Sequence, residues 1–185
     1  MIAIILMFCV GKTLRNYTII NNIKKVGNEI FNDTTQNYHM TILNEDGTAK
    51  TEVYYNSGIK RIETYFGEEL VTISWKNFET GESISKMGDT EVVYADDIDT
   101  TMKPRYFIEE DQKMSLLDYF KTTIKSDGNT YVLYFKPNYK CYYDKETSTL
   151  VKFEDIITGT DTPMTTNTCK IEFNTVSVSD VEKPE

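Results

Sequence analysis

The pattern of apolar and polar positions changes twice along the chain. Residues 1–10 are apolar without interruption. From Leu14 to Phe31, apolar residues recur every three or four positions, with Asn, Lys and Glu between them. This spacing predicts an amphipathic helix that packs one face against a sheet. Beyond it, the pattern changes to short alternating runs, which are typical of β-strands.

The apolar run at the N-terminus permits three interpretations. It is the end of a longer export or anchor segment, a short signal or anchor helix as it stands, or a buried helix segment. The run is shorter than the roughly 20 residues that cross a bilayer, and it lacks the flanking features of a signal peptide. Phe8 before Cys9 argues against lipidation. We favour export or anchoring, and we set residues 1–13 apart from the folded domain.

Runs of β-branched and aromatic residues, closed by turns that contain glycine, predict two groups of strands. The first group covers residues 36–44, 48–56, 59–66, 69–77, 82–87 and 90–95. The second group covers residues 130–136, 139–144, 149–156 and 167–178. Short turns between successive strands predict an antiparallel meander.

Two segments interrupt or end this pattern. Residues 96–113 are rich in carboxylates and lack periodicity, and we expect a solvated acidic loop because the ligand order of a calcium loop is missing. Residues 115–124 predict a short helix that begins with a capping box of Ser115 and Asp118. The polar residues 180–185 are expected to be frayed.

These elements predict an α+β fold that is mainly β. We expect a curved antiparallel meander sheet, or half-barrel, with an N-terminal amphipathic helix and a short helical insertion. Because no linker or repeat occurs, we expect a single domain over residues 14–180, followed by a polar tail over residues 181–185.

Composition and chemistry narrow the function. The net charge of −9 argues against nucleic acid as a partner and against docking of the folded domain on an anionic membrane. His39, the only histidine, lies in a predicted strand, where we expect a structural role. We therefore expect no catalytic residue, metal or cofactor, and no enzyme. A glycosidase-type carboxylate pair is the one enzymatic alternative, because such pairs are defined in space and not by spacing.

The cysteines leave two alternatives open. Cys141 and Cys169 lie in the last group of strands, and no C-x-x-C pair occurs. If the protein is exported, a disulfide between them is plausible. Otherwise they are two buried thiols at unrelated places.

Aromatic and branched residues on central strands are the candidates for a ligand site. Trp75 follows Ile73 on one face of its strand, and we expect it to be buried or to line a cavity. We place Phe66, Ile73, Trp75 and Phe135 in the lining of that site, although ordinary core packing predicts the same burial.

The order of elements resembles the superfamily of the outer-membrane lipoprotein carrier, whose relatives include RseB-type sensors and LppX-type lipid-binding lipoproteins. The resemblance is carried by residues 37–42 (NYHMTI), 57–62 (SGIKRI) and 173–178 (FNTVSV). It implies a curved sheet around a helical plug that holds acyl chains or a hydrophobic peptide on its concave side. An anchored chain without a lipobox would fit a bacterial relative that lacks an outer membrane.

We therefore expect a non-enzymatic binding protein of the cell envelope. It would be extracytoplasmic and anchored at the cell surface by its N-terminal segment. Its partner would be a lipid or an apolar segment of another envelope protein, held in the concave face of the sheet. The alternative is a structural or protein-interaction domain with a filled core and no ligand.

Overall fold

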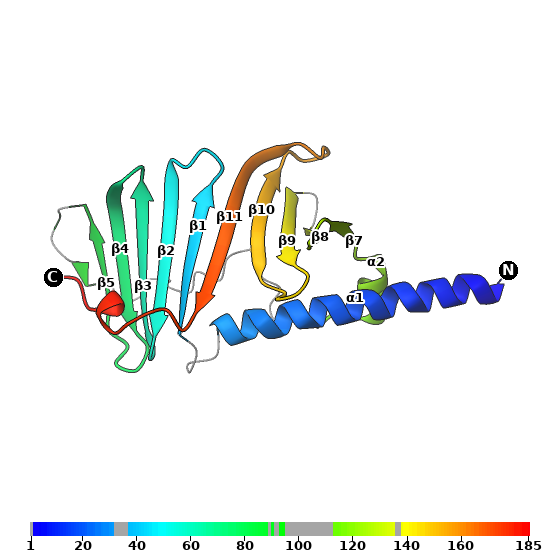
Figure 1. Cartoon of the computed structure of the whole chain (residues 1–185), viewed down its shortest axis with the longest axis horizontal. Helices are drawn as coiled ribbons and strands as arrows, with labels where there is room; N and C mark the ends of the chain where they lie inside the picture. The colour runs from blue at the N-terminus through cyan, green and yellow to red at the C-terminus, as the bar shows by residue number, and fades with distance from the viewer. Residues whose placement is uncertain (1, 32–36, 89, 91–92, 95–112, 136–137) are drawn as a thin grey trace. The chain divides into compact units, whose positions relative to one another are not determined.

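The computed structural model describes residues 2–31, 37–88, 90, 93–94, 113–135 and 138–185. The side chains of residues 2–5, 31, 93–94 and 135 lie outside that description. The fold class is α+β and mainly β, as predicted, with antiparallel strands, an N-terminal helix and a short second helix (Figure 1). Its contacts form two compact units, one of residues 1–29 with 106–164 and one of residues 30–105 with 165–185. The single domain over residues 14–180 stays a prediction.

The unit that contains residues 30–105 is an antiparallel meander. Its strands follow one another in space as they do in sequence, and β11 then pairs with β1 on the other side (Figure 1). The strands are β1 (Tyr38–Asn44), β2 (Ala49–Asn56), β3 (Ile59–Phe66), β4 (Glu69–Asn77), β5 (Ser83–Met87), β6 (Val93–Tyr94) and β11 (Pro163–Phe173).

The turn between β2 and β3 shows how local chemistry sets the register. Ser57 and Gly58 both have positive φ, 50° and 78°, and a two-residue turn of this kind matches the right-handed twist of a hairpin. Asn56 therefore pairs with Ile59, and the pairing continues to Ala49 with Phe66. The sequence predicted the bounds of β3 and β4 as they are observed.

The last strand is displaced from its predicted range. We expected a strand over residues 167–178, but β11 ends at Phe173. Asn174 has a φ of 59°, which Asn tolerates better than most residues, and its N–H donates to the carbonyl of Asn37. The chain therefore leaves the sheet five residues earlier than the apolar alternation suggested.

The register gives this meander two different faces. Met40, Val53 and Ile62 lie opposite one another on β1, β2 and β3, and all three are buried. On the other face, which we call the polar face, Glu52 lies opposite Glu63. Burial of each aliphatic side chain is worth about 1.5–3 kcal/mol, so the first face is the core of this unit.

The C-terminal segment, residues 177–185, is docked on the polar face, so the prediction that residues 180–185 are frayed is wrong. It contains the 3-10 helix η2 (Ser179–Val181), which contacts β2 and β3. Val181 is only 2% exposed, and the Trp75 indole N–H donates to its carbonyl at 2.8 Å. The Nζ of Lys86 donates to the carbonyl of Glu185 at 3.0 Å. The buried Val181 side chain and these hydrogen bonds hold residues 177–185 in place, although their polar composition alone predicted a frayed end.

The unit that contains residues 106–164 combines two helices with a second meander. Its strands pair in the order β10-β9-β8-β7. The elements are α1 (Ile2–Phe31), α2 (Leu116–Lys121), β7 (Ile124–Asp127), β8 (Thr130–Phe135), β9 (Tyr139–Asp144) and β10 (Leu150–Ile156). The expected acidic loop lies outside the described residues, apart from Lys113.

Helix α1 is continuous over 30 residues and passes through Gly11 without a break. The apolar run and the amphipathic helix, which the sequence suggested as separate segments, are therefore parts of one helix. Its buried positions include Asn16, Ile20 and Ile23. The Asn16 amide donates to the carbonyl of Tyr119 at 2.7 Å and to that of Thr122 at 2.9 Å. These hydrogen bonds satisfy carbonyls at the end of α2, which have no partner within the helix.

The short helix has the predicted start and an earlier end. Ser115 and Asp118 form the capping box, as the sequence indicated. The helix ends at Lys121, whereas we expected it to continue to Ile124. Ile124 instead begins β7 and lies opposite Leu133 of β8. Thr122, Thr123 and Ile124 are all β-branched, which disfavours a helix and favours a strand, and this strand was missed.

Docking of the C-terminal segment predicts a spectroscopic signature, because Trp75 is the only tryptophan and is 4% exposed. We expect blue-shifted emission from the native protein. Val181→Asp should shift the emission to the red and lower the free energy of unfolding by about 2 kcal/mol, the worth of one buried aliphatic side chain. Val178→Asp is the matched control, because Val178 is exposed in the same segment. Equal spectra for the two variants would contradict the docking.

Candidate functional sites: a charged row on the sheet and a groove between two helices

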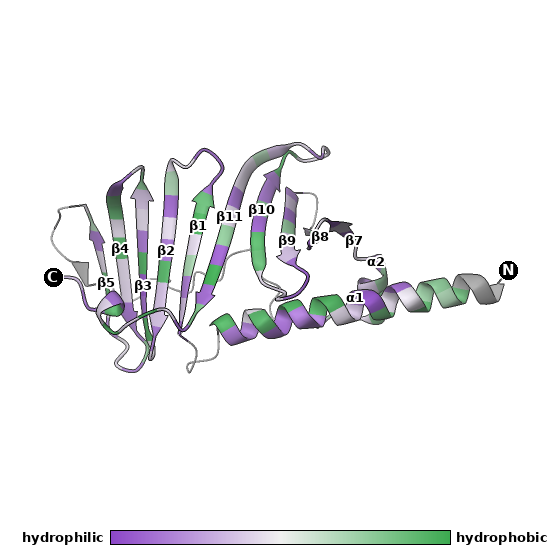
Figure 2. Ribbon diagram, viewed as in Figure 1, coloured by the Kyte–Doolittle hydropathy of each residue, from purple (hydrophilic) through white to green (hydrophobic). Residues whose placement is uncertain are grey.

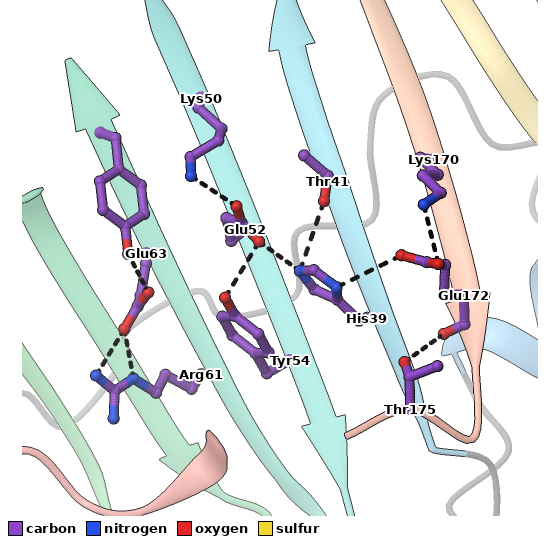
Figure 3. Close-up of polar contacts among 11 residues, drawn as sticks. His39, Thr41, Lys50, Glu52, Tyr54, Arg61, Glu63, Lys170, Glu172 and Thr175 are labelled. Atoms are coloured by element: carbon purple, nitrogen blue, oxygen red, sulfur yellow. Dashed lines mark hydrogen bonds and ion pairs between the residues drawn. The ribbon is translucent and has the colours of Figure 1, made fainter. Parts of the chain in front are cut away.

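A row of charged side chains crosses β3, β2, β1 and β11 on the polar face (Figure 3). Consecutive members come from neighbouring strands because cross-strand partners point to the same face of a sheet. Several are largely buried, which is unusual for charged groups unless they are paired. We call this set the charged row: His39, Lys50, Glu52, Arg61, Glu63, Lys170 and Glu172.

On β2, Glu52 is held from both sides along its own strand. The Lys50 Nζ lies 2.8 Å from one carboxylate oxygen, and the Tyr54 hydroxyl donates to the other at 3.1 Å. All three residues are two positions apart, so their side chains share one face. The pattern is a cation, a glutamate and a tyrosine at alternate positions.

The neighbouring strand β3 repeats the pattern. The Arg61 guanidinium contacts Glu63 Oε1 through Nη2 at 2.6 Å and through Nε at 2.8 Å. The Tyr65 hydroxyl donates to Glu63 Oε2 at 2.5 Å. Each buried glutamate therefore carries its own cation, although Glu52 and Glu63 are direct cross-strand neighbours.

The pairing determines how these groups ionise. Burial by itself raises the pKa of the Glu52 carboxyl, but hydrogen bonds from Lys50, His39 and Tyr54 and the charge of Lys50 outweigh it, and the pKa falls below its usual value. Burial and the hydrogen bond to Glu63 raise the pKa of Tyr65 to about 12. The Glu52 carboxyl is thus kept charged and the Tyr65 phenol neutral at neutral pH.

His39 lies between two carboxylates. Its Nε2 contacts Glu52 and is 3.5 Å from the Thr41 hydroxyl, and its Nδ1 is 4.0 Å from Glu172. The ring stacks on Tyr54 with the centroids 4.6 Å apart. A nucleophile–base–acid relay uses the two ring nitrogens for different partners, but here Thr41 and Glu52 share one nitrogen. The geometry is that of a structural histidine in an ion-pair network.

The charged row bears on the enzymatic alternative, because Glu52 and Glu63 are buried carboxylates on adjacent strands. A glycosidase requires one carboxyl whose pKa is raised so that it acts as an acid. The pKa of Glu52 is instead lowered, and Glu63 is bound by Arg61. Among the described residues, no group of three or more His, Cys, Asp or Glu side chains could hold a metal ion.

The same arrangement recurs in the other unit. Glu154 of β10 is buried and accepts from Lys152 Nζ at 2.6 Å and from the Tyr142 hydroxyl at 2.9 Å. Lys140 Nζ lies 4.0 Å from the same carboxylate. In both meanders, therefore, a buried glutamate is paired with a lysine two positions away and accepts a hydrogen bond from a tyrosine.

The structure separates the residues that we assigned to a ligand site. Ile73 and Trp75 share the polar face, because they lie opposite Glu63 and Arg61. Phe66 alternates with Ile62, lies on the opposite face and is 65% exposed. The side chain of Phe135 lies outside the described residues. Trp75 is buried, as predicted, and its neighbour is the C-terminal segment; a ligand-binding role for the four residues stays a prediction.

The two strand cysteines are buried free thiols. Burial raises the pKa of both, Cys141 and Cys169, to about 12, so neither is ionised at neutral pH and both are poor nucleophiles. A disulfide between them in an oxidising compartment stays a prediction.

A groove of about 570 Å³ lies between α1 and α2. Its walls include the Tyr17 and Tyr119 rings, which meet edge to face with their centroids 5.2 Å apart. No sequence pattern indicated this groove, because it joins two helices that are about 100 residues apart and neither helix carries a ligand-binding motif. We call it the helix groove, and its lining residues are Tyr17, Asn21, Lys24, Lys25, Lys113, Met114 and Tyr119.

The first turns of α1 are largely exposed. Figure 2 shows that the N-terminal half of this helix is largely apolar, whereas its second half alternates. Leu6, Met7, Phe8 and Val10 are each more than half exposed, and Phe8 reaches 71%. Across the described residues, no helix is both long and apolar enough to cross a membrane.

No protein-family model matches the chain, and no curated protein matches it. The charged row, the helix groove and the exposed turns of α1 are therefore interpreted from their physical chemistry.

The lowered pKa of Glu52 predicts how stability depends on pH. Its pKa is about 4.3 in an unfolded chain and lower in the fold, so the pair stabilises the fold at neutral pH and this contribution is lost as the pH falls through the folded value. We expect Glu52→Gln to be less stable than the wild type at pH 7 and the two urea midpoints to converge towards pH 3. Glu68→Gln, at an exposed turn, is the control. Midpoints of Glu52→Gln and wild type that fall in parallel would refute this role.

Proposed function

We propose that the chain is a non-enzymatic binding protein of the cell envelope that is attached to a membrane by the first turns of α1. The observation that carries the proposal is the exposure of Leu6, Met7, Phe8 and Val10, which together cover more than half of the circumference of the helix. A helix with an apolar surface of this extent is stable in water only when lipid or protein covers it. A membrane supplies such a cover without any specific partner.

The sheet supports a role in protein interaction more than a role in holding a lipid. The polar face carries the charged row, and a buried charge that faces acyl chains is costly. Ile73 and Trp75, two apolar residues of that face, are buried, and the Trp75 indole is hydrogen-bonded to the chain's own C-terminal segment. Of the two functions that the sequence left open, an interaction domain with a filled core therefore fits better. Its partner would be another envelope protein.

An extracytoplasmic location at a bacterial cell surface belongs to the same proposal. It is supported by the apolar start of α1 and by the resemblance of the strand order to the superfamily of the outer-membrane lipoprotein carrier. A cofactor and a nucleic acid have no place in the proposal.

Attachment to a membrane can be tested with vesicles of phosphatidylcholine. We expect the protein to float with the vesicles in a density gradient. Leu6→Asp should weaken this binding by about tenfold or more, because it replaces a large apolar side chain with a charge. Asn22→Asp adds the same charge at an exposed position of the same helix and should bind as the wild type does. Absence of wild-type flotation would reject the proposal.

Binding of a fluorescent fatty acid distinguishes an interaction domain with a filled core from a sheet that holds lipid. We expect no saturable binding to the protein free of vesicles, because Ile73 and Trp75 of the polar face are already buried. Saturable binding that is insensitive to salt and is weakened by Phe135→Asp would instead favour a sheet that holds lipid. Circular dichroism should confirm that this variant is folded.

A further inference from the structure

We propose that α1 and α2 together form a docking surface for an anionic lipid bilayer, with α1 lying along the membrane and with Lys25 and Lys113 of the helix groove against lipid phosphates. This inference deepens the proposed membrane attachment and rests on it. It adds an orientation, a lipid class and a second contacting element.

The surface begins as a stripe on α1. Leu6, Val10, Leu14 and Tyr17 follow one another at steps of three or four residues, so they share one side of the helix. Each is exposed, from 47% for Tyr17 to 60% for Leu14. The stripe continues at the same spacing through Asn21 to Lys25, which line the helix groove. Apolar residues followed by tyrosine and lysine are typical of a helix at a membrane interface.

The second helix extends this surface sideways. Tyr119 of α2 packs on Tyr17, and Phe120 lies 4.8 Å under the Lys12 ammonium group. The first turn of α2 presents Leu116 and Leu117, which are 74% and 56% exposed. These two leucines have no role in the core of their unit, and they lie on the helix that forms the other wall of the groove. An apolar surface shared by two helices is suited to a planar partner.

The local charge is opposite in sign to that of the chain. Residues 2–29 contain four basic side chains and one acidic one, and residues 113–121 contain two basic and one acidic, a net charge of +4 in a chain of −9. Charges beyond about 10 Å are largely screened at physiological salt, so the distant carboxylates of the chain contribute little at these helices, and the three carboxylates of residues 109–111, which precede Lys113, leave a local charge of about +1. The net charge of the whole chain, which argued against an anionic membrane, does not decide the matter for this surface.

The length of α1 favours docking along the membrane over end-on insertion. The helix rises about 1.5 Å per residue, so Lys24 and Lys25 lie about 20 Å along the axis from Val10. Headgroups extend only about 5–8 Å beyond the hydrocarbon core on each side. An upright helix with residues 2–10 in the hydrocarbon would therefore hold these two lysines away from the lipid phosphates.

The lipid class is tested by comparing vesicles of phosphatidylcholine with vesicles that contain one part in three of phosphatidylglycerol. We expect tighter binding to the anionic vesicles and a gain that falls with salt. Lys25→Gln with Lys113→Gln should remove about 25-fold of this gain, about fivefold for each lysine near an anionic surface. Lys125→Gln with Lys183→Gln, two exposed lysines outside this surface and outside the charged row, is the matched control and should keep the gain.

The orientation is tested at α2. Leu116→Asp with Leu117→Asp should weaken binding to both kinds of vesicle by about tenfold or more, and carboxylates in the first turn are compatible with the helix. Ile157→Asp with Met164→Asp changes two exposed apolar residues of the same unit and should bind as the wild type does. Unchanged binding of the Leu116/Leu117 variant would show that α2 does not contact the membrane and would overturn the inference.

The outcomes separate this inference from the proposed function. Flotation that depends on Leu6 but shows no preference for anionic lipid supports the proposed attachment and rejects the docking surface. Failure to float with either kind of vesicle rejects both. A dimer in sedimentation analysis that Leu116→Asp with Leu117→Asp dissociates would assign the surface to a second copy of the chain, and would likewise overturn the inference.

Discussion

The pairing of buried glutamates with cations is the constraint on which the sheets depend. Glu52, Glu63 and Glu154 each lie on a strand with a cation two positions away and accept a hydrogen bond from a tyrosine. An unpaired buried carboxylate would cost several kcal/mol, so none of these strands could tolerate the loss of its cation. Because the partners sit on the same strand, each pair forms with the strand itself. The row of charges then needs only the correct register to assemble across the sheet.

The charged row also explains why the polar face can be covered by the chain itself. Arg61 serves Glu63 and also donates to the carbonyl of Glu182 at 3.2 Å, so it joins the row to the C-terminal segment. Hydrogen bonds from Ser177 lower the pKa of Asp180, and the charges of His39 and Arg61 lower it further. The segment is thus held by charge on one side and by Val181 and Trp75 on the other. Function at this face would involve the outer surface of that segment, or its displacement by a partner.

Helix α1 combines two environments in one continuous element. Ile20 and Ile23 are buried in the core of their unit, whereas Leu6 and Phe8 are more than half exposed to solvent. On a surface that contacts only water, such large apolar residues are few and most positions are polar. Their presence, together with Leu116 and Leu117 on α2, is the observation on which the proposed membrane attachment rests. The sheets present charge and the helices present apolar surface, so the two kinds of element have different partners in the proposed function.

The sequence by itself determined the elements that depend on local chemistry: the strands β3, β4 and β9, the capping box of Ser115 and Asp118, and the burial of Trp75 on an alternating strand. It also contained the cation–glutamate–tyrosine pattern of β2 and β3, which was not recognised as a signal because alternation of polar residues on a strand usually means solvent. Only the tertiary structure decided that Glu52 and Glu63 are buried side by side, that residues 180–185 are docked, and that α1 and α2 share a groove. Each of these depends on contacts between residues far apart in the chain, which register and packing create and which no local pattern encodes.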